Sequence, residues 1–284
     1  MLEINKTVST NGISIFTSQI TDSLSDLAPF FGANAETVIN AAQRRFRSPK
    51  RLAERLTIEA MICAVLGENT TLYHTADGKP YCEGTNQNIS ISHSKTHAAL
   101  LVCNHPHCGV DIEQISPRIL NLASRFVTDE DKTDNPTVFC DEIGSFNNEN
   151  GSLSDKNGSL SNKNGTFNDE IASLIGESYN FRDNHATFSD DNKRENDKHK
   201  LLGDQRQILW LTTLWTIKEA AYKSVENQND IDLLTDIRVP APQIDALIRG
   251  EAQQNTVYIG NNSQEKHDVI SILVNDNILS YIAY

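Results

Sequence analysis

The segment GVDIE at residues 109–113 places two carboxylates, Asp111 and Glu113, two positions apart. Side chains of a strand alternate between its faces, so Val110 and Ile112 would share one face and the two acids the other, with Cα atoms about 6.6 Å apart. This spacing lets both acids reach one hard cation directly or through water. The alternative is an ordinary strand with a polar outer face, which shows the same alternation.

A further acid lies in the segment WTIKEAAYK, residues 215–223. Glu219 and Lys223 are four residues apart, which stacks them on one face of a helix. That face is turned away from an apolar stripe at helical spacing, which consists of Trp210, Leu214, Ile217 and Ala221. The pair is either functional or an ordinary exposed ion pair worth about 0.2–0.5 kcal/mol.

Ser92 and His93 stand at the end of the strand-like segment NISISHS. A serine beside a histidine suggests a nucleophile and its base, but neighbours on a strand point to opposite faces and no third residue orients the base. A hydrolase is therefore the weaker interpretation. His93 can instead donate to a phosphate, or it is a structural or solvated histidine.

A basic run contains a single acid, Glu54, and comprises Arg44, Arg45, Arg47, Lys50, Arg51 and Arg55. This density suits an anionic ligand. A solvated helix start is the alternative, although cations at a helix N-terminus oppose the helix dipole. Lys79, in the turn Asp77-Gly78-Lys79-Pro80, is another candidate for a phosphate contact, or else part of a plain surface turn.

The positions between these motifs predict an α+β protein. Ser48 as N-cap, Pro49 at the first helical position and Gly67 as a stop delimit one helix. The segments NISIS, AALLV and GVDIE are typical of strands, and so are TVYIG, DVISILV and ILSYIAY near the C-terminus. A second helix follows residue 204. The chain therefore reads as two α+β halves.

Asn, Gly, Ser and Asp dominate the stretch between the halves, where a seven-residue unit starts at Asn150, Asn157 and Asn164. Each unit has one apolar residue and an Asn-Gly turn signal, which favours a linker over a coiled coil. We expect an insertion at about 141–204 that does not pack and is dispensable. Residues 129–204 carry roughly −9 of the formal net charge of −13, so the remainder is nearly balanced.

Composition excludes several classes of protein. The negative net charge argues against general nucleic-acid binding, and no run of about 18 apolar residues or leader-like N-terminus is seen. We therefore expect a cytoplasmic protein that binds no membrane. The five cysteines form no CxxC pair and are expected to be reduced. His105, His107 and Cys108 are close in sequence, but a zinc site usually needs a second ligand pair.

Four motifs in this order, GKPY, NISISHS, GVDIE and WTIKEAAYK, resemble the 4′-phosphopantetheinyl transferase family, in its long single-chain type that acts on peptide and polyketide synthetases. The resemblance extends from about Phe46 to Ser224 and includes the pair Arg125-Phe126. It implies transfer of the phosphopantetheine arm of coenzyme A to a serine of an apo-acyl or peptidyl carrier protein. The alternative is a non-catalytic module that binds coenzyme A or the carrier protein.

The resemblance also implies roles for individual residues. Asp111, Glu113 and Glu219 would hold Mg²⁺, or Mn²⁺ in its place, against the pyrophosphate. Glu219 would be the catalytic base, and Lys223 would stabilise the leaving phosphate. Contacts to the phosphates and nucleotide would come from Arg51, Lys79, Pro80, Ser92, His93, Lys218 and Lys223. Arg51 and Arg55 both fit the arginine that the family carries in its first helix.

The fold implied by the resemblance is a monomer of two similar subdomains packed as a pseudo-dimer, with coenzyme A in the cleft between them. The boundary is expected near His107. The first subdomain would then span residues 1–107. The second would span residues 108–284 and carry the metal and catalytic motifs.

Overall fold

The computed structural model describes residues 2–10, 12–68, 70–134, 191–260 and 265–284. The N-terminal half contains a strand hairpin, a helical layer and two more pairs of strands, namely β1 (Asn5–Thr10), β2 (Ile13–Gln19), α1 (Leu24–Leu27), η1 (Ala28–Asn34), α2 (Ala35–Arg45), α3 (Pro49–Leu66), β3 (Leu72–His74), β4 (Pro80–Cys82), β5 (Asn88–His93) and β6 (His97–Cys103). The C-terminal half contains β7 (Cys108–Gln114), η2 (Pro117–Asn121), η3 (Ala123–Arg125), α4 (Asp129–Asp134), α7 (Asp191–Ser224), η4 (Gln228–Asp230), β8 (Ile237–Arg238), α8 (Asp245–Ile248), β9 (Gln253–Ile259), β10 (Lys266–Val274) and β11 (Asn277–Ala283). This mixture of helices and antiparallel sheets confirms the predicted α+β class.

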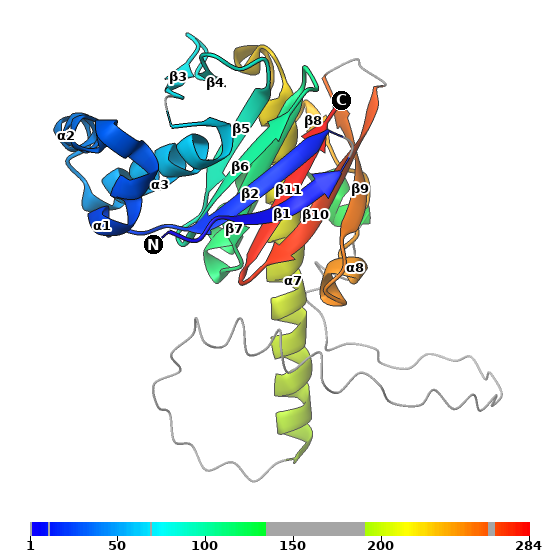
Figure 1. Ribbon diagram of the computed structural model, residues 1–284. Coiled ribbons are helices and arrows are strands. Elements are labelled where there is room, and N and C mark those ends of the chain that lie inside the picture. Colours follow the sequence, from blue (N-terminus) through cyan, green and yellow to red (C-terminus); the bar gives the residue numbers. More distant parts are fainter. Residues whose placement is uncertain (1, 11, 69, 135–190, 261–264) are drawn as a thin grey trace, which may run out of the picture.

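Two antiparallel sheets form the centre of the protein (Figure 1). The first has the strand order β1-β2-β6-β5 and the second β7-β11-β10-β9-β8, while β3 and β4 form a separate hairpin. The chain passes from the first sheet to the second between β6 and β7, next to the predicted boundary at His107. That the halves are separate subdomains related as a pseudo-dimer stays a prediction.

The hydrophobic core consists of three clusters, which lie between four layers: α3, the first sheet, the second sheet and α7. Ile15, Leu101, Val110 and Leu279 belong to the cluster between the two sheets. Helix α3 covers the outer face of the first sheet through residues such as Leu56 and Met61, and α7 covers the outer face of the second. Every residue of β6 is buried because the strand has neighbours on both faces. This explains why AALLV is a continuous apolar run rather than an alternating one.

The predicted helix starts and stops are borne out where local chemistry specifies them. Helix α3 begins at Pro49 and ends at Leu66, with Gly67 at φ 114° directly after it. A positive φ of this kind favours glycine, which has no Cβ to clash. Ser48 precedes the helix in an extended conformation, although its hydroxyl makes no capping hydrogen bond.

The predicted linker requires a correction at its C-terminal end. Helix α7 begins at Asp191, so the stretch 191–204 is helical and a deletion through 204 would remove its first turns. Residues 191–204 have a polar composition like that of the linker, and the apolar stripe starts only at Trp210. Composition therefore predicted the wrong boundary. The Asn-Gly units fall within 135–190, which lies outside the described residues. As predicted, Trp210, Leu214, Ile217 and Ala221 are buried.

Contact between β7 and α7 depends on Gly109. A Cβ at this position would lie 1.9 Å from the carbonyl oxygen of Ala220 and 2.9 Å from the amide nitrogen of Ser224. Because both neighbours are helix backbone, neither can move aside as a side chain would. Gly109 therefore sets how closely the strand that carries Asp111 approaches the helix that carries Glu219.

Among the described residues, no helix combines the length and the apolar character needed to cross a bilayer.

We predict that Gly109→Ala lowers the free energy of unfolding by about 3 kcal/mol, because the added methyl group forces β7 and α7 apart. Gly203→Ala is the matched control, since a Cβ at this exposed position of α7 meets no atom within 4 Å. The control should be neutral or stabilising by up to about 1 kcal/mol. Urea denaturation of both variants measures the difference, and equal stabilities would contradict the assigned packing.

Candidate active site

The edge strands of the two sheets lie side by side, and their side chains form the centre of the site. Strand β5 is the edge of the first sheet and β7 the edge of the second. They are joined by side chains, since the Ser90 hydroxyl accepts a hydrogen bond of 3.0 Å from the Val110 amide. Ser92 Oγ donates to Asp111 Oδ1 at 2.7 Å. Residues of the two separate motifs NISISHS and GVDIE therefore contact each other.

Lys223 of α7 completes this network. Its ammonium donates to Asp111 Oδ1 at 2.7 Å, to Ser92 Oγ at 3.0 Å and to the carbonyl oxygen of Val110 at 3.3 Å. A lysine ammonium has three N–H donors, so each one has a partner. The Asp111 side chain is only 5% exposed, and the ion pair compensates for the burial of its charge.

Three carboxylates, those of Asp111, Glu113 and Glu219, interact near Lys223. Burial and the charge of Asp111 raise the pKa of Glu113 to about 7, and the same two causes raise the pKa of Glu219 to about 7. The indole N–H of Trp215 donates to Glu113 and opposes the rise in its pKa. Asp111, Glu113 and Glu219 therefore interact electrostatically. The alternation of GVDIE predicted a shared face for Asp111 and Glu113, whereas the approach of Glu219 was implied only by the family resemblance.

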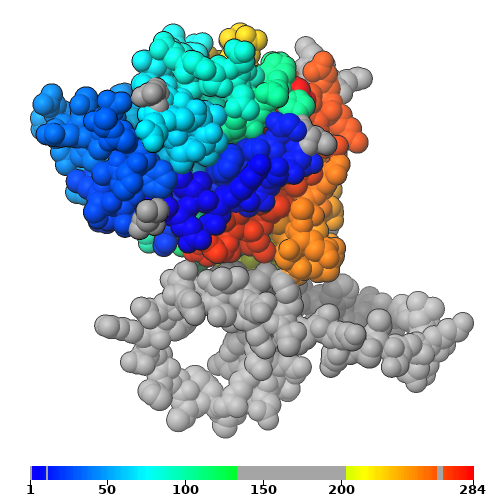
Figure 2. Space-filling view, viewed as in Figure 1, coloured from blue at the N-terminus to red at the C-terminus, as the bar shows by residue number. Residues whose placement is uncertain are grey.

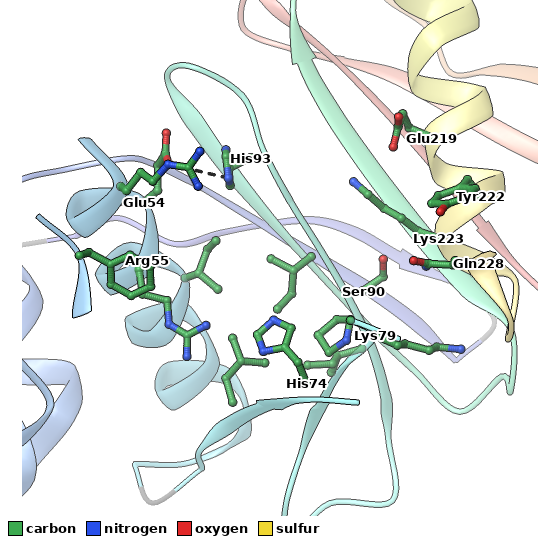
Figure 3. Close-up of a pocket in the computed structure, with 18 of the residues that line it drawn as sticks. Glu54, Arg55, His74, Lys79, Ser90, His93, Glu219, Tyr222, Lys223 and Gln228 are labelled. Carbon is green, nitrogen blue, oxygen red and sulfur yellow. Dashed lines mark ion pairs between the residues drawn. The ribbon is translucent and has the colours of Figure 1, made fainter. Parts of the chain in front are cut away.

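A cleft of about 440 Å³ opens beside these residues, between α3, the β3–β4 hairpin, β5 and α7 (Figure 3). Its cations are Arg45, Arg51, Arg55, Lys79 and Lys223. Its acids are Glu54 and Glu219, and its apolar surface includes Phe46, Ile58, Leu72, Ile89 and Ile91. The cleft is thus positively charged along most of its length and acidic where α7 passes, which suits a ligand with several negative charges.

Most of the predicted ligand-binding residues line this cleft. Arg51, Lys79, Pro80, His93 and Lys223 are all part of its wall, although they come from four separate segments. Ser92 is buried behind the wall, where it holds Lys223 and Asp111, whereas His93 points outward, as alternation along a strand requires.

Both candidate arginines of α3 face the cleft, but their surroundings differ. Arg55 is bound to Glu59, with Nε and a terminal nitrogen within 2.7 Å of the same oxygen. Within the part of the chain that the structure describes, Arg51 has no carboxylate partner. Arg51 therefore offers an uncompensated charge to an anion, while Arg55 offers one that Glu59 already holds in position.

Lys218 is placed away from the other predicted phosphate ligands. Its side chain is 1% exposed, with the ammonium 3.7 Å from Asp131 Oδ2, and it lines a second cavity of about 180 Å³. Successive residues of a helix point about 100° apart, and Lys218 lies on the side of α7 that faces Asp131, whereas Glu219 lines the cleft. Burial lowers the pKa of Lys218, and the charge of Asp131 opposes this effect.

The donor set fits a hard divalent cation only in part. Asp111 Oδ2 is buried without a hydrogen-bond partner, on a carboxylate next to two other acids. Mg²⁺ prefers such oxygen ligands. However, among the described residues no three His, Cys, Asp or Glu side chains are close enough together to form a metal site. Lys223 supplies the positive charge that balances Asp111 in this arrangement.

Sequence reasoning did not assign several residues of the cleft. His74, Tyr222 and Gln228 also line it, and burial together with the charges of Arg55 and Arg45 lowers the pKa of His74. A signal existed for His74, because it ends the strand-like segment directly before the turn that carries Lys79. Tyr222 directly precedes Lys223 in a motif that was already identified, but periodicity alone did not distinguish its direction.

Comparison with family models and with curated protein sequences finds no match to this chain. The functional interpretation therefore depends on the motifs and on the geometry of the site.

We predict that Glu113→Gln stabilises the fold at pH 8 by on the order of 2 kcal/mol. The pKa of Glu113 is raised from 4.5 to about 7, so between these values the native state binds more protons than the unfolded chain. Stability therefore falls as the pH rises through this window, and the neutral amide removes the loss. Thermal unfolding at pH 5 and pH 8 in the presence of a chelator measures the difference in stability between Glu113→Gln and the wild type. Glu226→Gln, at an exposed position, is the control. An equal difference at both pH values would contradict the prediction.

We also predict that Lys223→Met lowers the free energy of unfolding by about 3–5 kcal/mol, because it leaves the buried Asp111 carboxylate without its cation. Combining Asp111→Asn with Lys223→Met should restore most of this loss. A double-mutant cycle in urea measures the coupling energy. Additive losses in the double variant would show that the two residues do not interact across the strands.

Proposed function

We propose that this protein transfers the 4′-phosphopantetheine group of coenzyme A to a serine of an apo-carrier protein, releasing 3′,5′-adenosine bisphosphate. One observation carries the proposal: Glu219 and Lys223 line one part of a cationic cleft, and Asp111 and Glu113 of a distant motif interact with them, through the Lys223–Asp111 ion pair and through the charges of the acids. A reaction at a pyrophosphate needs this combination, in which cations bind the polyanion and acids lie at the reacting end.

The cleft has the properties that coenzyme A would require. Its volume of about 440 Å³ is within the range of small-molecule sites, and it combines apolar walls with a few charged groups. Arg51 and Lys79 are cationic and, among the described residues, have no carboxylate partner. They would bind phosphate groups, while the apolar side chains would contact the planar base.

The three carboxylates are the groups that would hold Mg²⁺. Asp111 would contribute its unpartnered Oδ2, and Glu113 and Glu219 would complete the set after small movements of their side chains. When bound, the cation would neutralise the pyrophosphate and remove its repulsion by the acids.

Transfer requires a proton acceptor and a group that stabilises the leaving phosphate. The serine oxygen forms a bond to the β-phosphorus while the bond to the bridging oxygen of adenosine bisphosphate breaks. Glu219 has a pKa of about 7, so near neutral pH it can take the serine proton. Lys223 lies within the same wall and would turn its ammonium from Asp111 to the leaving phosphate.

The geometry also allows a non-catalytic module that binds coenzyme A or the carrier protein. The observation that favours this alternative is the ion pair itself, because Lys223 occupies Asp111 Oδ1 and no three acids are gathered for a metal among the described residues. Both candidates predict binding of coenzyme A, and only the transferase predicts a modified serine.

Intact-mass measurement tests the proposal. The full chain is incubated with coenzyme A, Mg²⁺ and several apo-carrier proteins, and we expect one phosphopantetheine group on a carrier. Asp111→Ala should reduce the rate by at least about 100-fold, because one of the assembled charges is lost. Asp245→Ala, at an exposed position of α8 outside the cleft, is the control. Binding of coenzyme A without a modified carrier would reject the transferase in favour of the binding module.

A further inference from the structure

Glu54 is out of place in a cleft that attracts anions. It belongs to α3, is 8% exposed, and lines the cleft together with Arg51 and Arg55. Figure 3 shows it beside His93, at the end of the cleft away from Lys223. A carboxylate here would repel the phosphates that the arginines bind, so its position requires a physical reason of its own.

The contacts of Glu54 leave its hydrogen-bonding capacity unused. Lys50 Nζ lies 3.5 Å from Oε1 and His93 Nε2 lies 3.8 Å from Oε2, both beyond the length of a good hydrogen bond. Within the described part of the chain, no donor group hydrogen-bonds to this carboxylate. An ionised carboxylate can accept about four hydrogen bonds, so both oxygens of Glu54 keep the capacity to accept a donor inside the cleft. A donor on the ligand would supply the missing partner.

The wall around Glu54 restricts the chemistry of such a ligand. Apolar side chains of Phe46, Ile58 and Ile91 offer a surface for a planar ring, while Arg51 offers positive charge. A molecule that combines a flat apolar ring, phosphate groups and at least one hydrogen-bond donor matches all three features. A nucleoside phosphate has this composition.

We propose that Glu54 is a specificity-determining residue, whose carboxylate accepts a hydrogen bond from the nucleoside part of the ligand. The donor is the exocyclic amine of adenine or a ribose hydroxyl. That the nucleotide belongs to coenzyme A rests on the proposed function, whereas the role of Glu54 does not require transfer. Hypoxanthine has a carbonyl oxygen where adenine has the amine, and this oxygen would face the carboxylate with two acceptors and no proton between them.

Titration calorimetry with adenosine 3′,5′-bisphosphate and inosine 3′,5′-bisphosphate tests the proposal on the full chain without any transfer. We expect the wild type to prefer the adenine compound by about tenfold or more. Glu54→Gln should reduce this preference to within about twofold, because its amide can donate to the hypoxanthine oxygen. Glu226→Gln, which is exposed and outside the cleft, should keep the wild-type preference. Glu54→Asp keeps the charge and should show an intermediate preference if the amide variant does not fold.

A third titration, with 2′-deoxyadenosine 3′,5′-bisphosphate, separates the two donors. If the wild type ignores the base but loses affinity for the deoxy compound, and Glu54→Gln removes that loss, the ribose hydroxyl is the donor. Unchanged preferences in Glu54→Gln, or an equal gain in affinity for every nucleotide and for pyrophosphate, would overturn the proposal. A preserved adenine preference without carrier modification would reject the transferase and leave Glu54 in its role.

Discussion

The buried ion pair between Lys223 and Asp111 is the interaction on which the site depends, because it joins three elements that have no ladder pairing with one another. Lys223 extends from α7, Asp111 from β7, and Ser92 from β5 bridges the two. Separating any one of them would leave a charge or a hydroxyl buried without a partner. The network therefore fixes the two sheets at their edges and sets the position of Glu219 one helical turn away.

Close packing of strand and helix is what makes this network possible. Gly109 lets β7 approach the backbone of α7 at Ala220, and buried hydroxyls of Thr216, Ser280 and Ser271 form a continuous chain beneath the helix. These contacts are short and directional, so the helix has little freedom to rotate or slide over the sheet. The rigid region is therefore the one that carries the acids, while the opposite wall of the cleft is formed by α3 and a two-stranded hairpin.

Opposite charges are separated along one cleft. The charge of Asp111 on β7 raises the pKa values of Glu113 and Glu219, and the cations of α3 and the hairpin lie on the facing wall. A polyanion bound there would be attracted at one end and repelled at the other unless a proton or a cation intervenes. Glu54 interrupts this pattern, because it is an acid within the cationic wall and is separate from the acids of β7 and α7.

Sequence periodicity by itself determined the direction of side chains within each element. Alternation placed Asp111 and Glu113 on one face of β7, and the helical period placed Glu219 and Lys223 away from the stripe that contains Leu214. Proline and glycine fixed the ends of α3, because their backbone restrictions act locally. The hairpin of β1 and β2 was not assigned, although its alternating pattern was a usable signal.

Tertiary structure alone decided which of these faces meet. Ser92 and Lys223 are 131 positions apart, and no local pattern states that their elements are neighbours. No local pattern states that Lys218 faces Asp131 rather than the cleft, or that the polar residues 191–204 form the first turns of α7. Periodicity describes directions relative to an element's own axis. Contacts between elements follow from the packing of the complete core, which determines how those axes lie against one another.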